Sequence, residues 1–200
     1  MKKRTLALLA SVAAIVSGCV VTSVAPYYTE KDVVFEPGLI GNWIKTADDT
    51  NSDSEVWKFE KKGASAYRFT WITSEKAMLM DAHAFKLQGQ LFVDLSPVEK
   101  DWTIIPPHYL LKVSPTGSSL HMATLSHDWL KQFVAKEPAS IMHQLISSES
   151  DSNDKRVVLT ADTPELQKFV LKNLKTPEAW DQEFVLTPEP ATAPTRETKK

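Results

Sequence analysis

Residues 55–73 read EVWKFEKKGASAYRFTWIT, and this stretch decides the fold class. Apolar and polar side chains alternate along residues 55–61 and again along residues 67–73, which is the period of a β-strand with one buried face. The residues between the two runs include Gly63 and have the composition of a turn. The sequence therefore predicts a β-hairpin that gathers its aromatic side chains on one face.

The same period of two continues on both sides of this hairpin. It predicts further strands over residues 39–45, 77–87, 90–95, 108–113, 119–125, 141–146 and 156–160. Short turns separate most of them, so the strands form an antiparallel meander. A meander of about eight strands tends to close on itself, because closure removes the two unpaired edges.

Two segments change to a helical period. Residues 126–134 place apolar side chains on one stripe, and Ser126 is the expected N-cap. A second helix is predicted over residues 163–174, with Thr163 as N-cap and Pro164 at the first helical position. The predicted fold class is mainly β with two short helices, as a small barrel or a curved sheet.

Composition excludes several classes of protein. The chain has 200 residues, 42% of them hydrophobic and 24% charged, which is the balance of a globular domain. A net charge of −2 argues against a general nucleic-acid binder, which needs clustered Lys and Arg. With a single cysteine, Cys19, the chain can form no intrachain disulfide.

The first nineteen residues carry an export signal. A basic start at residues 1–4 precedes the apolar run TLALLASVAAIV at residues 5–16. The next residues, Val16-Ser17-Gly18-Cys19, resemble the lipobox of bacterial lipoproteins. The resemblance implies cleavage before Cys19 and lipid on its sulfur, which would attach the protein to the bilayer. An uncleaved transmembrane anchor and a soluble secreted protein are the alternatives.

The resemblance also suggests a location and a division of the chain. Val20 follows the cysteine, and the absence of Asp there resembles the pattern directed to the outer membrane, facing the periplasm. We expect residues 1–18 to be the signal peptide and residues 19–36 a lipidated tether. The β-rich globular domain is expected over residues 37–186, followed by a disordered tail, residues 187–200, that is rich in Pro and Thr.

Gly41-Asn42-Trp43 in the first predicted strand resembles the Gly-x-Trp motif of the lipocalin family. The resemblance implies an eight-stranded barrel with an apolar cavity for a small ligand. It also implies that Trp43 closes one barrel end and that a basic residue of the last strand, here Arg156, packs over its ring. The alternative is another small barrel or curved sheet packed with helices.

Aromatic side chains are the candidate ligand-binding residues. Trp57, Phe59, Tyr67, Phe69 and Trp71 share one face of the hairpin, where they either line an apolar pocket or form the packed core of the barrel. The loop at residues 97–109 adds Trp102, which either contacts a ligand or partner or folds over a barrel end.

Catalytic chemistry has little support in the sequence. No two histidines have the His-x-x-x-His spacing of a helical zinc site, and no glycine-rich loop could hold a phosphate. Asp81, His83 and Asp94 could meet on neighbouring strands, which leaves a metal or acid–base cluster as a minor alternative.

We therefore expect a membrane-anchored envelope lipoprotein that is not an enzyme and has no cofactor or metal. Two kinds of partner remain open besides the bilayer itself. One is a small apolar ligand in a lipocalin-like cavity, and the other is an envelope protein that binds the surface of a filled domain.

Overall fold

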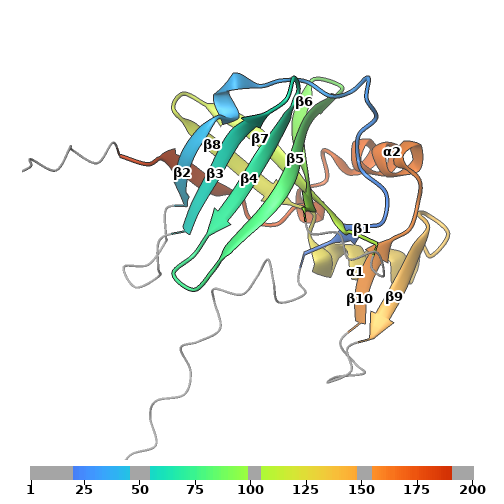
Figure 1. Cartoon of the computed structure of the whole chain (residues 1–200). Helices are drawn as coiled ribbons and strands as arrows, with labels where there is room; N and C mark the ends of the chain where they lie inside the picture. The colour runs from blue at the N-terminus through green and yellow to red at the C-terminus, as the bar shows by residue number, and fades with distance from the viewer. Residues whose placement is uncertain (1–19, 46–54, 99–104, 148–154, 191–200) are drawn as a thin grey trace, which may run out of the picture.

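The computed structural model of the chain describes residues 20–45, 55–98, 105–147 and 155–190. Within these residues, eight strands form a closed antiparallel β-barrel, and further strands and two α-helices pack against one side of it (Figure 1). The barrel strands are β2 (Gly41–Lys45), β3 (Glu55–Lys62), β4 (Ala66–Ile72), β5 (Ala77–Leu87), β6 (Gln90–Pro97), β7 (His108–Thr116), β8 (Ser119–Thr124) and β11 (Phe184–Pro188). The predicted mainly-β fold and small barrel are confirmed.

Strand pairing follows the predicted meander and then closes it with a distant segment. From β2 to β8, each strand pairs with the next one along the chain, and β11 completes the ring between β8 and β2. We did not predict β11, because it is short and ends at Pro188 within the expected tail. Its pairing of Pro188 with Trp43 also extends the folded domain beyond the expected boundary at residue 186.

Most elements outside the barrel form a second layer. They are β1 (Thr22–Ser23), β9 (His143–Ser147), β10 (Lys155–Leu159), α1 (His127–Lys136), α2 (Thr163–Asn173) and the short 3₁₀ helix η2 (Pro177–Ala179). A second 3₁₀ helix, η1 (Pro37–Leu39), packs on the barrel core instead. β1 joins this layer to the barrel, since it pairs with β7 on one side and with β10 on the other. Strands β9 and β10, predicted as part of the meander, therefore lie outside the ring.

Two hydrophobic cores share one wall of the barrel. Alternate residues of β5 to β8 point to opposite faces, as the strand period requires. Ala84 and Val93 point into the barrel, whereas Phe85 and Phe92 point outward and pack with Leu166 and other side chains of the helices. Part of this wall therefore carries apolar side chains on both faces, and the second layer covers the outer ones, which would otherwise be exposed to water.

The expected tether is part of the folded domain. Val20 forms an isolated β-bridge with Ser126, and Val21 and Tyr27 are buried. Residues 20–36 are here called the N-terminal strap, because they cross the outside of the barrel. The sequence pattern missed this packing because the strap has almost no regular secondary structure, although it carries apolar residues that need to be buried.

The two helices begin almost where the sequence predicts. Ser126 caps α1, where its side chain accepts a hydrogen bond from the Trp129 N–H. The N-cap of α2 is Asp162 rather than Thr163, because the Asp162 carboxylate accepts from the Glu165 N–H at 3.0 Å. The Thr163 hydroxyl instead donates to the Pro26 carbonyl at 2.7 Å and so ties α2 to the N-terminal strap.

Candidate functional site

The five aromatic residues of the predicted pocket fill the barrel interior. Their side chains are between 0% and 2% exposed and belong to one hydrophobic core, in which four of the rings contact one another. The Phe69 ring centre lies 4.8 Å from that of Phe59 and 5.3 Å from that of Trp57, and Phe59 meets Tyr67 edge-on. Such contacts between aromatic rings contribute about 0.5–1.5 kcal/mol each beyond the area they bury. The arrangement is that of a packed core.

The polar atoms of these rings are bonded within the protein. The Glu55 carboxylate accepts from the indole N–H of Trp71 at 3.2 Å and from that of Trp57 at 3.5 Å. The Tyr67 hydroxyl accepts from the Glu36 N–H at 2.6 Å. Because these groups already have partners, the interior offers few free donors to orient a ligand.

The short helix η1 covers one end of the barrel, the end at which β2 begins. Leu39 of η1 is fully buried, and its carbonyl accepts from the Trp43 indole N–H at 2.9 Å. Gly41, the first residue of the Gly-x-Trp motif, has φ of 141°, which L side chains rarely adopt. Trp43 therefore packs beneath η1, at the end of the barrel that this helix covers.

The expected packing of Arg156 over Trp43 is wrong. Arg156 lies on β10, and strands β1, β7, β8 and β11 separate β10 from β2 in the sheet. The sequence suggested β10 as the last barrel strand because it precedes a helix, but β11 has that position. Arg156 is exposed and lies near Tyr109 instead.

Three polar residues considered as a cluster lie on the outer face of β5 and β6, but they have separate partners. Asp81 pairs with Lys62 at 2.5 Å. The His83 ring stacks on Tyr28 with 4.5 Å between ring centres. Asp94 is 1% exposed and binds neither of them. Within the described ranges, no three His, Cys, Asp or Glu side chains are grouped to hold a metal ion.

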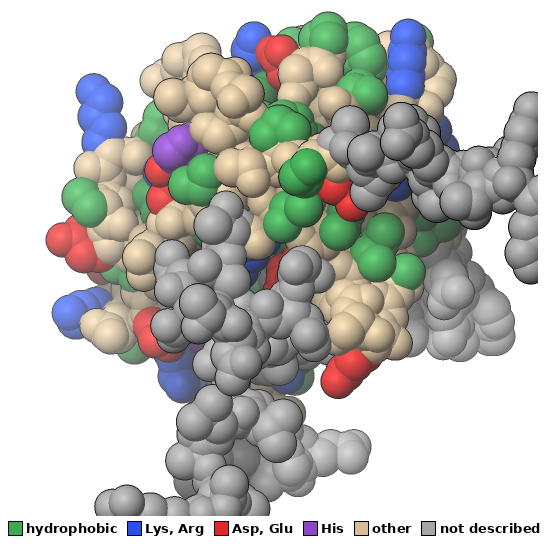
Figure 2. Space-filling model, turned by 90° about the vertical axis from the view of Figure 1, so that its left-hand side faces the viewer, with side chains coloured by type: hydrophobic (Ala, Val, Ile, Leu, Met, Phe, Trp, Pro, Cys, Tyr) green, Lys and Arg blue, Asp and Glu red, His purple; other side chains and the backbone are tan. Residues whose placement is uncertain are grey.

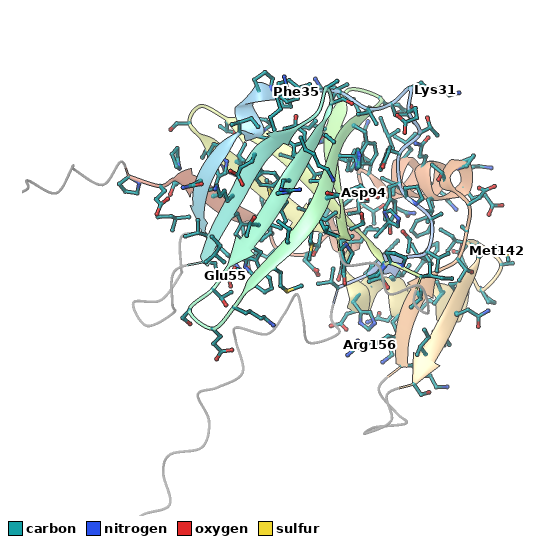
Figure 3. The ribbon with its side chains drawn as sticks, viewed as in Figure 1. Lys31, Phe35, Glu55, Asp94, Met142 and Arg156 are labelled. Atoms are coloured by element: carbon teal, nitrogen blue, oxygen red, sulfur yellow. The ribbon has the colours of Figure 1, made fainter. Side chains whose placement is uncertain are left out.

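Asp94 fastens the N-terminal strap to the barrel. One carboxylate oxygen accepts from the Tyr27 N–H at 2.9 Å, and the other lies 2.7 Å from Nδ1 of His108 on β7. Figure 3 shows Asp94 on the side of the barrel that faces the second layer. Tyr27 and His108 were not singled out from the sequence. The signal that could have found them is Asp94 itself, a carboxylate inside the apolar run Leu91–Leu95, since a buried carboxylate requires hydrogen-bond donors.

Burial shifts the titration of the groups around Asp94. Desolvation raises the pKa of Tyr27 well above its usual range and, with help from the negative charge of Asp94, raises that of Tyr28 to about 12. Desolvation also lowers the pKa of His83, although Asp94 and other acidic groups oppose this change. Both tyrosines therefore stay protonated near neutral pH, and His83 is biased towards its neutral form.

Further hydrogen bonds hold the strap along its length. Gln167 of α2 donates to the Tyr27 carbonyl at 3.0 Å and to the Asp32 carboxylate at 2.8 Å. The Val34 N–H donates to the Ala84 carbonyl of β5 at 2.9 Å. The strap is thus bonded to the barrel and to α2 at once, which fixes the position of the start of the domain.

A surface groove lies away from the barrel, between residues 138–143 and α2. Its volume is about 510 Å³, and Met142, which lines it, is 63% exposed. Strand β9 begins beside the groove and pairs with β10. Among the described residues, no strand pairs with the other edge of β9. An unpaired strand edge next to exposed apolar side chains is a common feature of protein-binding surfaces.

Comparisons with known proteins do not assign the chain to a family: no family model matches it, and neither curated proteins nor solved structures give a match. Two of the predicted site residues, Cys19 and Trp102, lie outside the described residues. In the part that the structure describes, no helix is both long and apolar enough to cross a bilayer.

Proposed function

We propose that this chain is a lipid-anchored protein of the bacterial cell envelope whose barrel acts as a non-catalytic interaction domain. The observation that carries the choice of an interaction domain over a carrier is the packed interior. The rings of Trp57, Phe59, Tyr67 and Phe69 contact one another in series, and all five aromatic residues, Trp71 included, are at most 2% exposed. A filled barrel leaves the surface as the place of binding.

The anchor is supported by the sequence before Val20. The basic start, the short apolar run and Val16-Ser17-Gly18-Cys19 together have the form of a lipoprotein signal. Two or three acyl chains on one residue hold a protein at a membrane for long times, whereas a single chain binds reversibly. We infer that Cys19 carries these chains and that the domain faces the periplasm from the outer membrane.

The face of the domain on the β2 side carries no large patch of one charge among its visible described residues. Figure 2 shows hydrophobic side chains in the central part of this face and both basic and acidic side chains around it. Nucleic acids are recognised through continuous basic patches, and the described residues visible on this face form none. The groove beside Met142 lies on another side of the domain, and its lining combines Glu165 and Lys168 with apolar side chains. We assign this groove and the free edge of β9 to a protein partner.

Replacing Cys19 with alanine should abolish lipid attachment. Radiolabelled palmitate should be incorporated into the natural chain and be lost in Cys19→Ala, with the protein moving from the membrane fraction to the soluble fraction. The matched control is Ser17→Ala, which keeps a small residue before the cysteine. Undiminished labelling of Cys19→Ala would show that lipid is attached elsewhere or that the signal is not a lipobox.

The packed interior predicts that fatty acids find no site in the barrel. Titration of long-chain fatty acids against the purified domain should give no saturable change in the fluorescence of its six tryptophans. A saturable change at one site per chain would instead support a lipocalin-like carrier of an apolar ligand, and it would overturn the choice of an interaction domain.

A further inference from the structure

One hydrogen bond shows which backbone groups of β9 point to its free edge. The Thr160 N–H donates to the Met142 carbonyl at 2.9 Å, so these two residues form a hydrogen-bonded pair just before β9. Hydrogen-bonded and non-hydrogen-bonded pairs alternate along antiparallel strands. The N–H and C=O groups of His143, Leu145 and Ser147 therefore point away from β10, and among the described residues no strand pairs with them.

The free edge of β9 lacks the features that keep strand edges from pairing. Proteins protect exposed edges with charged residues or proline, and the five residues of β9 include neither. Seven large hydrophobic side chains are exposed among the described residues, and three of them lie on or beside β9. Met142 is 63% exposed, Leu145 48% and Ile146 52%. Unpaired backbone groups next to exposed apolar side chains favour the addition of a strand from a partner.

The groove lies where β9 begins. One wall is formed by residues 138–143, which lead into the strand, and the other is formed by one face of α2. Figure 1 shows β9 at the outer edge of the second layer, with its start below α2. Ile141 and Phe169 line the groove and are only 6% and 5% exposed, so its deeper part is apolar. A strand that pairs with the free edge of β9 and continues past His143 therefore reaches the groove.

The charged side chains around the groove are mainly basic. Lys168 and Lys172, one helical turn apart on α2, line the groove and are exposed. Neither forms an ion pair with a described residue. Both also line a neighbouring hollow of about 590 Å³, whose described lining includes no acidic residue. Glu165 is the one acidic residue in the described lining of the groove, so two positive charges face one negative charge. This excess favours a partner segment that carries a carboxylate.

The direction of the added strand decides which of its ends meets these lysines. β9 runs from the groove towards Ser147, so an antiparallel strand on its free edge runs towards the groove and ends beside it. Antiparallel pairs are the commoner kind, and β9 already pairs in this way with β10. A carboxylate at the carboxyl end of the added strand then lies beside Lys168 and Lys172. A carboxylate at its amino end lies beside Ser147, about 13 Å away along the strand.

We propose that the partner of this domain supplies an extended segment that adds to β9 as an antiparallel strand, with an acidic carboxyl end beside Lys168 and Lys172. This inference rests on the proposed interaction domain, whose kind of partner it names, and it does not depend on the lipid anchor. Backbone hydrogen bonds to β9 supply affinity for any extended segment. The apolar groove and the two lysines then select among such segments by their side chains.

Two synthetic peptides of the same composition test this proposal. In the first peptide, Thr-Val-Ile-Val-Thr is followed by two glutamates, and in the second the two glutamates come before it. Both are acetylated and amidated, so the glutamates carry their only charges. Each peptide is titrated into the isotope-labelled full chain in detergent micelles, and the backbone amide NMR signals are followed. The first peptide should shift the signals of His143, Leu145 and Ser147. It should bind about threefold or more tightly than the second, as expected for exposed ion pairs.

Matched variants test the lysines and the backbone bonds separately. Lys168→Glu combined with Lys172→Glu should remove or reverse the preference for the first peptide. Lys76→Glu combined with Lys175→Glu makes the same change of net charge at exposed residues outside the groove, and it should keep the preference. Methylation of the backbone nitrogen of the peptide's isoleucine, which faces Leu145, should abolish binding. Methylation at the valine before it, whose N–H points away from β9, should not.

The outcomes separate this inference from the proposed function on which it rests. No shift at β9 with either peptide, or equal or tighter binding of the second peptide, would overturn the acidic added strand and leave the packed interior untouched. An unchanged preference in the variant of Lys168 and Lys172 would overturn their role in selection. Shifts of the indole N–H signals of Trp57 and Trp71 without shifts at β9 would place the peptide inside the barrel, and they would overturn the interaction domain as well.

Discussion

Phe69→Ala should lower the free energy of unfolding by about 3–5 kcal/mol, which is the usual cost of removing a fully buried aromatic ring. The ring is 2% exposed and contacts Trp57 and Phe59, so its removal leaves a cavity that the rigid barrel wall cannot close. Chemical denaturation followed by tryptophan fluorescence measures the change. The midpoint should shift while the denaturant slope stays the same.

The matched control for Phe69 is its neighbour Arg68, which is exposed on the outer face of the same strand. Arg68→Ala should change the free energy of unfolding by no more than about 0.5 kcal/mol. If Phe69 lined an open pocket, Phe69→Ala would leave stability close to that of the natural chain and alter the binding of apolar dyes instead. That result would contradict the packed interior.

Asp94→Ala should lower the free energy of unfolding by a similar amount, about 3–5 kcal/mol, because it leaves the buried Tyr27 N–H and the partly buried His108 ring without the carboxylate. The Tyr27 N–H and Nδ1 of His108 both lose the carboxylate that they contact. The loss should also free the N-terminal strap, so proteolysis between Val20 and the barrel should become faster. Denaturation and limited proteolysis measure the two effects.

A double-mutant cycle separates the contribution of the Asp94–His108 contact from the rest of this loss of stability. Asp94→Ala combined with His108→Ala should show a coupling energy of about 1.5–3 kcal/mol, typical of a hydrogen bond to a charged group. His121 and Glu183 are the matched control, since they lie at 2.6 Å with the same atoms facing but are 28% and 49% exposed. Their coupling should stay below about 1 kcal/mol. Equal coupling in the two pairs would argue against a special contribution of the buried Asp94–His108 contact to stability.

Most strands could be predicted from the sequence because local patterns determine them. The alternation in residues 55–73 gives β3 and β4 nearly to the residue, and the isolated glycines locate the turns. What the pattern does not contain is which strands meet. β11 pairs with β2 and β8 through backbone bonds that carry no sequence signature, so the ring could be expected but its last member could not.

The candidate site, too, has features that the sequence predicts and features that it does not. That Trp57 and its neighbours share one face follows from the period of two, but whether the barrel is open or filled depends on how rings from different strands fit together. The contacts of Asp94 are harder still to predict, because its partners Tyr27 and His108 come from segments far apart in the chain. A buried carboxylate indicates that donors exist, although it does not say where they are.

The position of β11 has a consequence for how the protein reaches its folded state. The barrel closes by pairing one of the last segments of the chain with the first barrel strand, a contact between residues separated by most of the domain. Contacts of such high sequence separation form slowly. Until this last strand is available, β2 and β8 keep unpaired edges, so the barrel cannot close before almost the whole domain is present.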